Sequence, residues 1–153
     1  MPGPETLAAF YHDAYDGAQT GYFAKPDSKL RRSLTRLRII RRYRKTGGGN
    51  FLDIGCNGGF MVEAARRTGF NAWGIEPDAV SLGYARKHFP DNQYFHGLIS
   101  DFDPRDASEA PIRFSVAYCS EVIEHVPQPR DFLRNIYRPL LPGGLLYLTT
   151  PDI

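Results

Sequence analysis

A short buried strand that turns tightly into a helix, over residues 50–60, constrains this chain more than any other segment. Phe51, Leu52 and Ile54 supply the apolar run of a strand that is covered on both faces. Glycines follow at Gly55 and at positions 58 and 59, where backbone amides can approach a ligand without a Cβ in the way. The segment therefore predicts the strand-turn-helix unit that binds nucleotide-like ligands.

The residues of this turn also restrict the kind of ligand. Asp53 places a carboxylate at the strand end, where it would repel a pyrophosphate but attract an ammonium group. The dinucleotide fingerprint needs glycines at positions that hold Gly55, Asn57 and Phe60 here, so it fails at two of the three. An acid followed by glycines at alternate positions fits better, because Asn57 tolerates a positive φ and Gly59 completes the pattern. We therefore expect a nucleoside that carries an amino acid.

A second acid lies at the tip of the next predicted strand, over 71–75. Glu76, followed by Pro77 and Asp78, is placed to accept hydrogen bonds from both ribose hydroxyls. The alternative role for Glu76 is an acid at the N-terminus of the following helix.

Strands and helices alternate along the rest of the chain. The pattern predicts strands near 51–54, 70–75, 93–97, 114–119 and 145–150, helices near 58–68, 78–88 and 129–138, and an acidic loop over 100–111. This alternation is typical of an α/β fold with a Rossmann-like doubly wound parallel sheet and helices on both faces. The first and fourth strands should flank the point where the strand order reverses, and the ligand should bind there.

Four blocks resemble the class I S-adenosylmethionine-dependent methyltransferases in order and spacing. They are LDIGCNGG at 52–59, GIEPD at 74–78, SEVIEHV at 120–126 and LPGG at 141–144. Within this family the chain looks most like the small-molecule branch that includes ubiquinone-biosynthesis O-methyltransferases. The resemblance implies S-adenosylmethionine as cofactor and methyl transfer to a small-molecule acceptor.

The resemblance also implies the residues of the site. The expected cofactor contacts are Asp53, Gly55, Cys56, Asn57, Gly59, Glu76, Pro77, Asp101, Cys119, Ser120 and Glu121. Asp53 would attract the methionine ammonium, and Asp101 would accept from the adenine amino group, although the whole loop around Asp101 is acidic. His125 lies where the methyl group would face the acceptor and could serve as a base, or it could hydrogen-bond a neighbouring loop.

The N-terminal part, residues 1–46, is predicted to form a lid and a cap helix before a cofactor-binding core over 47–153. Residues 25–45 hold ten basic side chains and one acid, and Leu30, Leu34, Leu37 and Ile40 recur there at helical spacing. This basic amphipathic helix is either a patch for nucleic acid, anionic lipid or an acidic substrate, or a cap whose arginines are solvated or paired with the acidic body; we favour the cap. The aromatic residues of the lid are Phe10, Tyr11, Tyr15, Tyr22 and Phe23.

The C-terminal end departs from the family pattern, because the family's seven-stranded sheet has two further strands. Either the core is truncated, or a partner or a swapped segment covers the exposed edge strand, or the protein is a minimal variant of the family; an uncovered edge strand would favour self-association. No apolar run is long enough to span a membrane, and the start of the chain lacks a signal-peptide layout, so a cytoplasmic location is expected. Cys56 and Cys119 are expected to be reduced thiols, and no metal site is predicted.

Two functions from different classes follow. The first is an S-adenosylmethionine-dependent methyltransferase of a small molecule; the second is a cofactor-binding or scaffold module without turnover. An RNA methyltransferase is a subordinate form of the first, motivated by the basic helix alone, and nucleic acid is not the favoured partner. The Asn/Asp-Pro-Pro-aromatic block of amino-methylating relatives is absent after Tyr118, which disfavours base N-methylation.

Overall fold

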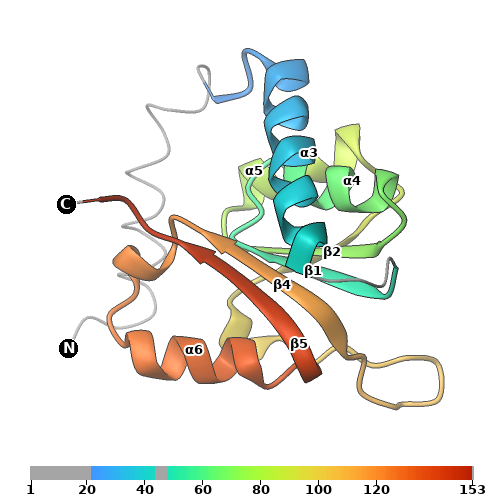
Figure 1. Cartoon of the computed structure of the whole chain (residues 1–153), viewed down its shortest axis with the longest axis vertical. Coiled ribbons are helices and arrows are strands. Elements are labelled where there is room, and N and C mark those ends of the chain that lie inside the picture. Colours follow the sequence, from blue (N-terminus) through green and yellow to red (C-terminus); the bar gives the residue numbers. More distant parts are fainter. Residues whose placement is uncertain (1–21, 44–47, 153) are drawn as a thin grey trace.

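A computed structural model describes residues 22–43 and 48–152 of the chain. Within these ranges five strands form one parallel sheet in the order β3-β2-β1-β4-β5 (Figure 1). They are β1 (Asn50–Ile54), β2 (Asn71–Glu76), β3 (Gln93–His96), β4 (Phe114–Ser120) and β5 (Leu140–Thr149). Because β1 pairs with β2 on one side and β4 on the other, the strand order reverses beside β1. The predicted doubly wound sheet and its switch point are confirmed.

Helices cover both faces of this sheet, as predicted. They are α3 (Pro26–Tyr43), α4 (Phe60–Arg67), α5 (Ala79–His88) and α6 (Pro129–Tyr137), with short 3-10 helices η1 (Ile99–Asp101) and η2 (Ile123–His125). Helices α3 and α4 lie over one face, and α6 lies over the other (Figure 1). In the described ranges, no helix combines the length and apolar character that a membrane span requires.

The alternation of side chains along the central strands divides the core into two clusters. Phe51 packs with Leu37 of α3 on one face, whereas Leu52 packs with Ile136 of α6 on the other, and all four are fully buried. A parallel sheet that is buried on both faces needs such continuous apolar strands. Truncation of a core leucine of this kind costs about 2–5 kcal/mol of stability.

Helix α3 begins close to the predicted start. Asp27 lies in its first turn and Arg41 and Arg42 in its last, which complements the helix dipole. Its buried side chains Leu37 and Ile40 share a core cluster with α4. The division of the chain into a cap over 1–46 and a core over 47–153 stays a prediction. The part of the predicted lid over 1–21 and the basic positions 44–45 lie outside the described residues.

Strand β5 differs most from its prediction, because it begins at Leu140 rather than near 145. Leu140 pairs with Phe114, and the register then shifts between Phe114 and Val116. Pro142 has no N–H to donate and Gly143 has a φ of 72°, so the local sequence reads as a turn. Pairing with β4 overrides that local signal. The loop predicted over 100–111 also differs from the structure, because residues 100 and 101 belong to η1.

Candidate cofactor site

The first glycine of the turn after β1 is required by both its conformation and its surroundings. Gly55 has a φ of 76°, and a Cβ there would lie 2.6 Å from Cγ2 of Val122. The N–H groups of Gly55 and Cys56 both donate to the carbonyl oxygen of Ile75 at 2.9 Å. Asn57 has a φ of 47°, a conformation that asparagine tolerates. These bonds hold the turn against the end of β2.

The next two glycines allow close packing against aromatic side chains. A Cβ on Gly58 would lie 2.6 Å from the Phe23 ring, and one on Gly59 would lie 2.8 Å from the hydroxyl of Tyr94. Neither residue lines the cavities described below. Neighbouring side chains therefore fill the space that a Cβ would need at both positions, and a ligand contact of the Gly59 backbone stays a prediction.

Glu76 is fixed by the backbone at the carboxyl end of β2. Its Oε2 accepts the Asn57 N–H at 2.8 Å and its Oε1 accepts the Asp78 N–H at 2.9 Å, while only 3% of the residue is exposed. Burial raises the pKa of Glu76, and the two N–H donors partly offset that rise. Asp78 provides the side-chain cap of α5 by accepting the Ser81 N–H at 2.8 Å. Asp78 therefore supplies the side-chain cap of α5, while Glu76 binds the backbone N–H of Asp78 itself.

Asp53 is a second buried carboxyl, at the end of β1. Its burial, and next the charge of Glu76, raise its pKa well above its usual range. A cationic ligand group would relieve the electrostatic cost of ionising two neighbouring buried carboxyls.

Two cavities meet at the glycine turn. We name the first the strand-end cavity; its volume is about 460 Å³, and it is lined by Ile54, Gly55, Asn57, Ile75, Glu76, Pro77, Gly97, Leu98, Ile99, Ser100, Ser120, Glu121, Val122, His125, Phe132 and Asn135 among others. We name the second the α3 cavity; its volume is about 330 Å³, and it is lined by Lys29, Arg32, Ser33, Arg36, Asp53, Gly55, Cys56, Asn57, Phe60, Met61, Tyr118, Ser120 and Glu121, with Tyr22. Since Tyr22, Gly55, Asn57, Ser120 and Glu121 line both, the two cavities adjoin.

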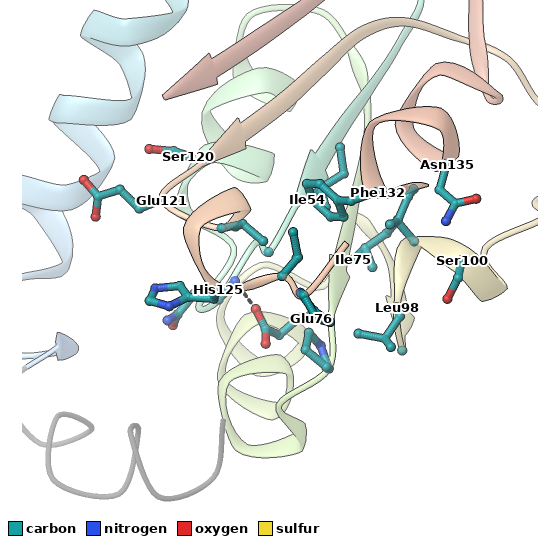
Figure 2. A pocket seen from close by; sticks show the side chains of 18 of the residues that line it. Ile54, Ile75, Glu76, Leu98, Ser100, Ser120, Glu121, His125, Phe132 and Asn135 are labelled. Atoms are coloured by element: carbon teal, nitrogen blue, oxygen red, sulfur yellow. Dashed lines mark hydrogen bonds between the residues drawn. The ribbon is translucent and has the colours of Figure 1, made fainter. Parts of the chain in front are cut away.

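The strand-end cavity combines apolar walls with one buried carboxylate. Figure 2 shows Glu76 between His125 and Leu98, with Ile54, Ile75 and Phe132 at the opposite wall. Such a pocket suits a flat heterocycle attached to a hydroxylated sugar.

The α3 cavity is polar, and one wall of it is cationic. Arg36 Nη1 donates to the Tyr118 hydroxyl at 3.0 Å, and Lys29 Nζ lies 3.2 Å from the centroid of the Tyr22 ring. Burial, and next the charge of Arg32, lower the pKa of Lys29. Within the described ranges no α3 side chain forms an ion pair, so the arginines are not paired with the acidic body there.

Sequence reasoning missed this cationic wall. Positions 29, 32 and 36 repeat at helical spacing, which is a usable signal, but the favoured prediction was a cap helix whose arginines are solvated or paired with the acidic body. Only the packing of α3 beside the turn shows that these three residues face a cavity.

Most of the predicted site residues lie around the two cavities. Gly55, Asn57, Glu76, Pro77, Ser120, Glu121 and His125 line the strand-end cavity, and Asp53 and Cys56 line the α3 cavity. Three of the described residues in the prediction, Gly59, Asp101 and Cys119, line neither. Asp101 is exposed on η1, and its neighbours Ile99 and Ser100 reach the cavity instead. Cys119 lies in the core, where burial raises the pKa of its thiol to about 12.

His125 lies at the mouth of the strand-end cavity on η2. Its backbone N–H donates to the Val122 carbonyl at 3.0 Å, and half of its side chain is exposed. Its Nε2 lies 3.9 Å from Oε1 of Glu124, too far for a hydrogen bond. The ring therefore keeps both access to the cavity and contact with solvent.

Comparison with known proteins gives matches over nearly the whole described region. A family model described as a methyltransferase domain matches residues 22–153. The mitochondrial ubiquinone biosynthesis O-methyltransferase of Schizosaccharomyces pombe is 33% identical over 119 residues, covering 73% of this chain and 41% of that protein. The ubiquinone biosynthesis O-methyltransferase of Pseudomonas aeruginosa strain UCBPP-PA14 is 37% identical over 107 residues, covering 67% and 44%. The chain thus spans less than half the length of these relatives.

Solved structures share the fold at lower identity. The plantazolicin methyltransferase BpumL, solved with a substrate analogue and S-adenosylhomocysteine, superposes with a TM-score of 0.71 at 15% identity, covering 94% of this chain and 56% of that one. An amino pentose methyltransferase from Micromonospora echinaspora, solved with S-adenosylmethionine, gives 0.61 at 22% identity, covering 91% and 56%. These likenesses support the fold.

The residues that the cofactor of such enzymes would need are present. The carboxylate at the tip of β2 is buried and oriented, and Asn57, whose buried side-chain oxygen has no partner among the described residues, lines both cavities. Together with the match to the family model, this arrangement shows that the chain belongs to the methyltransferase-domain family, among the class I S-adenosylmethionine-dependent methyltransferases that its sequence motifs resemble.

Proposed function

We propose that this protein binds S-adenosylmethionine across the two adjoining cavities and transfers its methyl group to a small molecule in the cytoplasm. The observation that carries the proposal is the pair of buried carboxyls, Asp53 and Glu76, at the ends of β1 and β2 on either side of the glycine turn. Their place beside the strand switch point is the place at which open parallel sheets bind ligands.

The strand-end cavity would hold the adenosine part. Glu76 keeps further lone pairs for ribose hydroxyls after accepting its two backbone N–H donors. Ile75 and Leu98 would contact the adenine faces, and Ser100 lies closer to the cavity than Asp101 does. The predicted adenine contact of Asp101 stays a prediction.

The α3 cavity would hold the amino-acid part and admit the acceptor. Asp53 supplies a negative charge for the ammonium group, and Arg36 supplies a positive charge for the carboxylate. The remaining basic side chains, Lys29 and Arg32, would contact the acceptor or solvent.

When bound, the cofactor supplies an electrophilic methyl group on a sulfonium. The chain aligns the acceptor with that methyl group, and for a hydroxyl acceptor a base must take the proton. We assign this base to His125, because its ring lines the cavity and stays partly solvated.

Calorimetric titration with S-adenosylhomocysteine tests the cofactor site. We expect a micromolar dissociation constant that Asp53→Ala and Glu76→Ala both abolish. Asp103→Ala is the matched control, because Asp103 is an exposed acid that pairs with Arg105 and lines neither cavity. A folded wild-type chain that gives no binding would overturn the proposal. Binding without methyl transfer to a panel of phenols, amines and acids would favour the non-catalytic module.

RNA as acceptor is the second candidate, and the exposed α3 arginines that lack ion pairs within the described region are the observation that favours it. It predicts RNA binding that weakens steeply with salt. A filter-binding assay with structured RNA at two salt concentrations would measure it.

A further inference from the structure

The side chain of Asn57 has a buried polar atom that the fold leaves without a partner. Its residue is 9% exposed, and its Oδ1 accepts no hydrogen bond from the described residues. An unpaired buried carbonyl oxygen destabilises a folded protein measurably. Three other side chains in the described region share this property, Trp73, Ser81 and Asn92, but Asn57 alone among the four lines the cavities.

The conformation of Asn57 adds to this observation. Its φ of 47° lies in the left-handed region, where glycine is less strained than any other residue. A glycine would therefore satisfy the backbone at this position and would remove the unpaired oxygen. The turn explains why asparagine is tolerated here, but neither the turn nor the core explains why it is present instead of glycine.

The neighbours of Asn57 indicate which ligand group would pair with it. Its N–H donates to Glu76 at 2.8 Å, so the residue lies beside the carboxylate that would hold the ribose. It also lies at the junction of the two cavities, between the apolar wall for the base and the polar cavity for the amino acid. A ribose hydroxyl is the hydrogen-bond donor that this location would present to it.

We propose that Asn57 Oδ1 accepts a hydrogen bond from a ribose hydroxyl of the bound cofactor, so that Asn57 and Glu76 together recognise the ribose. The inference rests on the proposed cofactor site. It assigns to the middle position of the turn a side-chain contact that a glycine could not make.

Asn57→Gly gives a test in which the two interpretations predict opposite signs. If the side chain serves only the turn, the variant binds S-adenosylhomocysteine as tightly as the wild type or more tightly, because glycine relieves strain. If Asn57 contacts the cofactor, affinity falls by roughly three- to tenfold while the unfolding temperature of the free protein is unchanged or higher. Asn92→Ala is the control, since it removes an equally buried amide with an unpaired oxygen that lines neither cavity.

Binding of methylthioadenosine identifies which ligand group donates the hydrogen bond to Asn57, because this compound keeps the ribose but lacks the amino acid. We expect Asn57→Gly to weaken the binding of methylthioadenosine and of S-adenosylhomocysteine by the same factor. A loss confined to S-adenosylhomocysteine would assign the contact to the ammonium group and overturn the ribose assignment. Equal affinity of variant and wild type for both ligands would overturn the contact while leaving the cofactor site intact, and a wild type that binds neither ligand would overturn both proposals.

Discussion

The strand-end cavity and the α3 cavity adjoin at one turn, yet their charged groups are held in opposite ways. Glu76 is buried at a strand end, and two backbone N–H groups fix its carboxylate. Lys29, Arg32 and Arg36 extend from one helix, and Arg32 and Arg36 are exposed. The first arrangement is preorganised for one ligand group, whereas the second offers positive charge to any anion of suitable size. Substitutions in the two cavities should therefore differ in size and in salt dependence.

The largest effect is expected from Glu76→Ala in the strand-end cavity. The substitution removes the ribose acceptor and leaves the N–H groups of Asn57 and Asp78 unpaired. Hydrogen bonds to a charged group contribute about 1.5–3 kcal/mol each, so we expect at least a 100-fold loss of S-adenosylhomocysteine affinity by calorimetry. A loss below tenfold in a folded variant would show that the fixed carboxylate is not the main contact.

Asp53→Asn should weaken cofactor binding and increase the stability of the folded protein. Because the pKa of Asp53 is raised in the folded protein, ionising it there costs more than in the unfolded chain. Its contribution to stability is thus present at low pH and is lost as the pH rises from the unfolded value of 3.8 through the raised folded value. Compared with the wild type, the Asp53→Asn variant should become more stable as the pH increases. Its unfolding temperature should exceed that of the wild type by roughly 2–4 °C for each kcal/mol of ionisation cost that the substitution removes.

Thermal unfolding of wild type and Asp53→Asn between pH 4 and 8 measures this difference. In the same protein, the contribution of Glu63 to stability should depend on pH in the opposite direction. Burial alone would raise its pKa, but hydrogen bonds from Arg66, Arg67 and Asn92 lower it to about 2. Its contribution is present above its usual pKa of 4.5 and lost as the pH falls toward 2. A temperature difference between wild type and Asp53→Asn that stays constant with pH would contradict the burial argument.

Arg36→Gln should have a smaller effect, and one that salt reduces. We expect a three- to tenfold loss of S-adenosylhomocysteine affinity at low salt and no change for methylthioadenosine, which carries no carboxylate. Arg38→Gln is the matched control, because Arg38 is an exposed arginine of α3 that lines neither cavity. Equal losses in the two variants would indicate a general effect of helix charge.

The smallest effect on cofactor binding is expected from His125→Gln, within about twofold, because half of the ring faces solvent. Methyl transfer to a hydroxyl acceptor should nevertheless fall by roughly 10²–10⁴-fold, the usual contribution of a general base. Turnover measured at saturating cofactor separates the two effects. If turnover of the His125→Gln variant equals that of the wild type at every pH from 6 to 9, His125 has a role in loop structure alone.

Local sequence was sufficient to predict β1, the turn after it and the acid at the end of β2. The apolar run of β1, the positive φ of Asn57 and the acid at the end of β2 depend on residues close together in the chain, and the structure confirms each. The start of β5 was predicted too late because its partner, Phe114, lies far away in sequence.

What the sequence indicated by itself is therefore the alternation of strands and helices and the glycine turn after β1, which follow from periodicity and short-range chemistry. Four motif blocks added the resemblance to a family. Tertiary structure alone decided which charged and polar groups face the cavities. Packing of α3 beside the turn brings Arg36 to the hydroxyl of Tyr118, eighty-two positions away in the chain. Packing of α5 and β3 brings Ala85 and Tyr94 against Gly59. Such contacts depend on how helices pack against the sheet. Periodicity groups the polar side chains of one helix on a face, but it does not identify the neighbour that this face will meet.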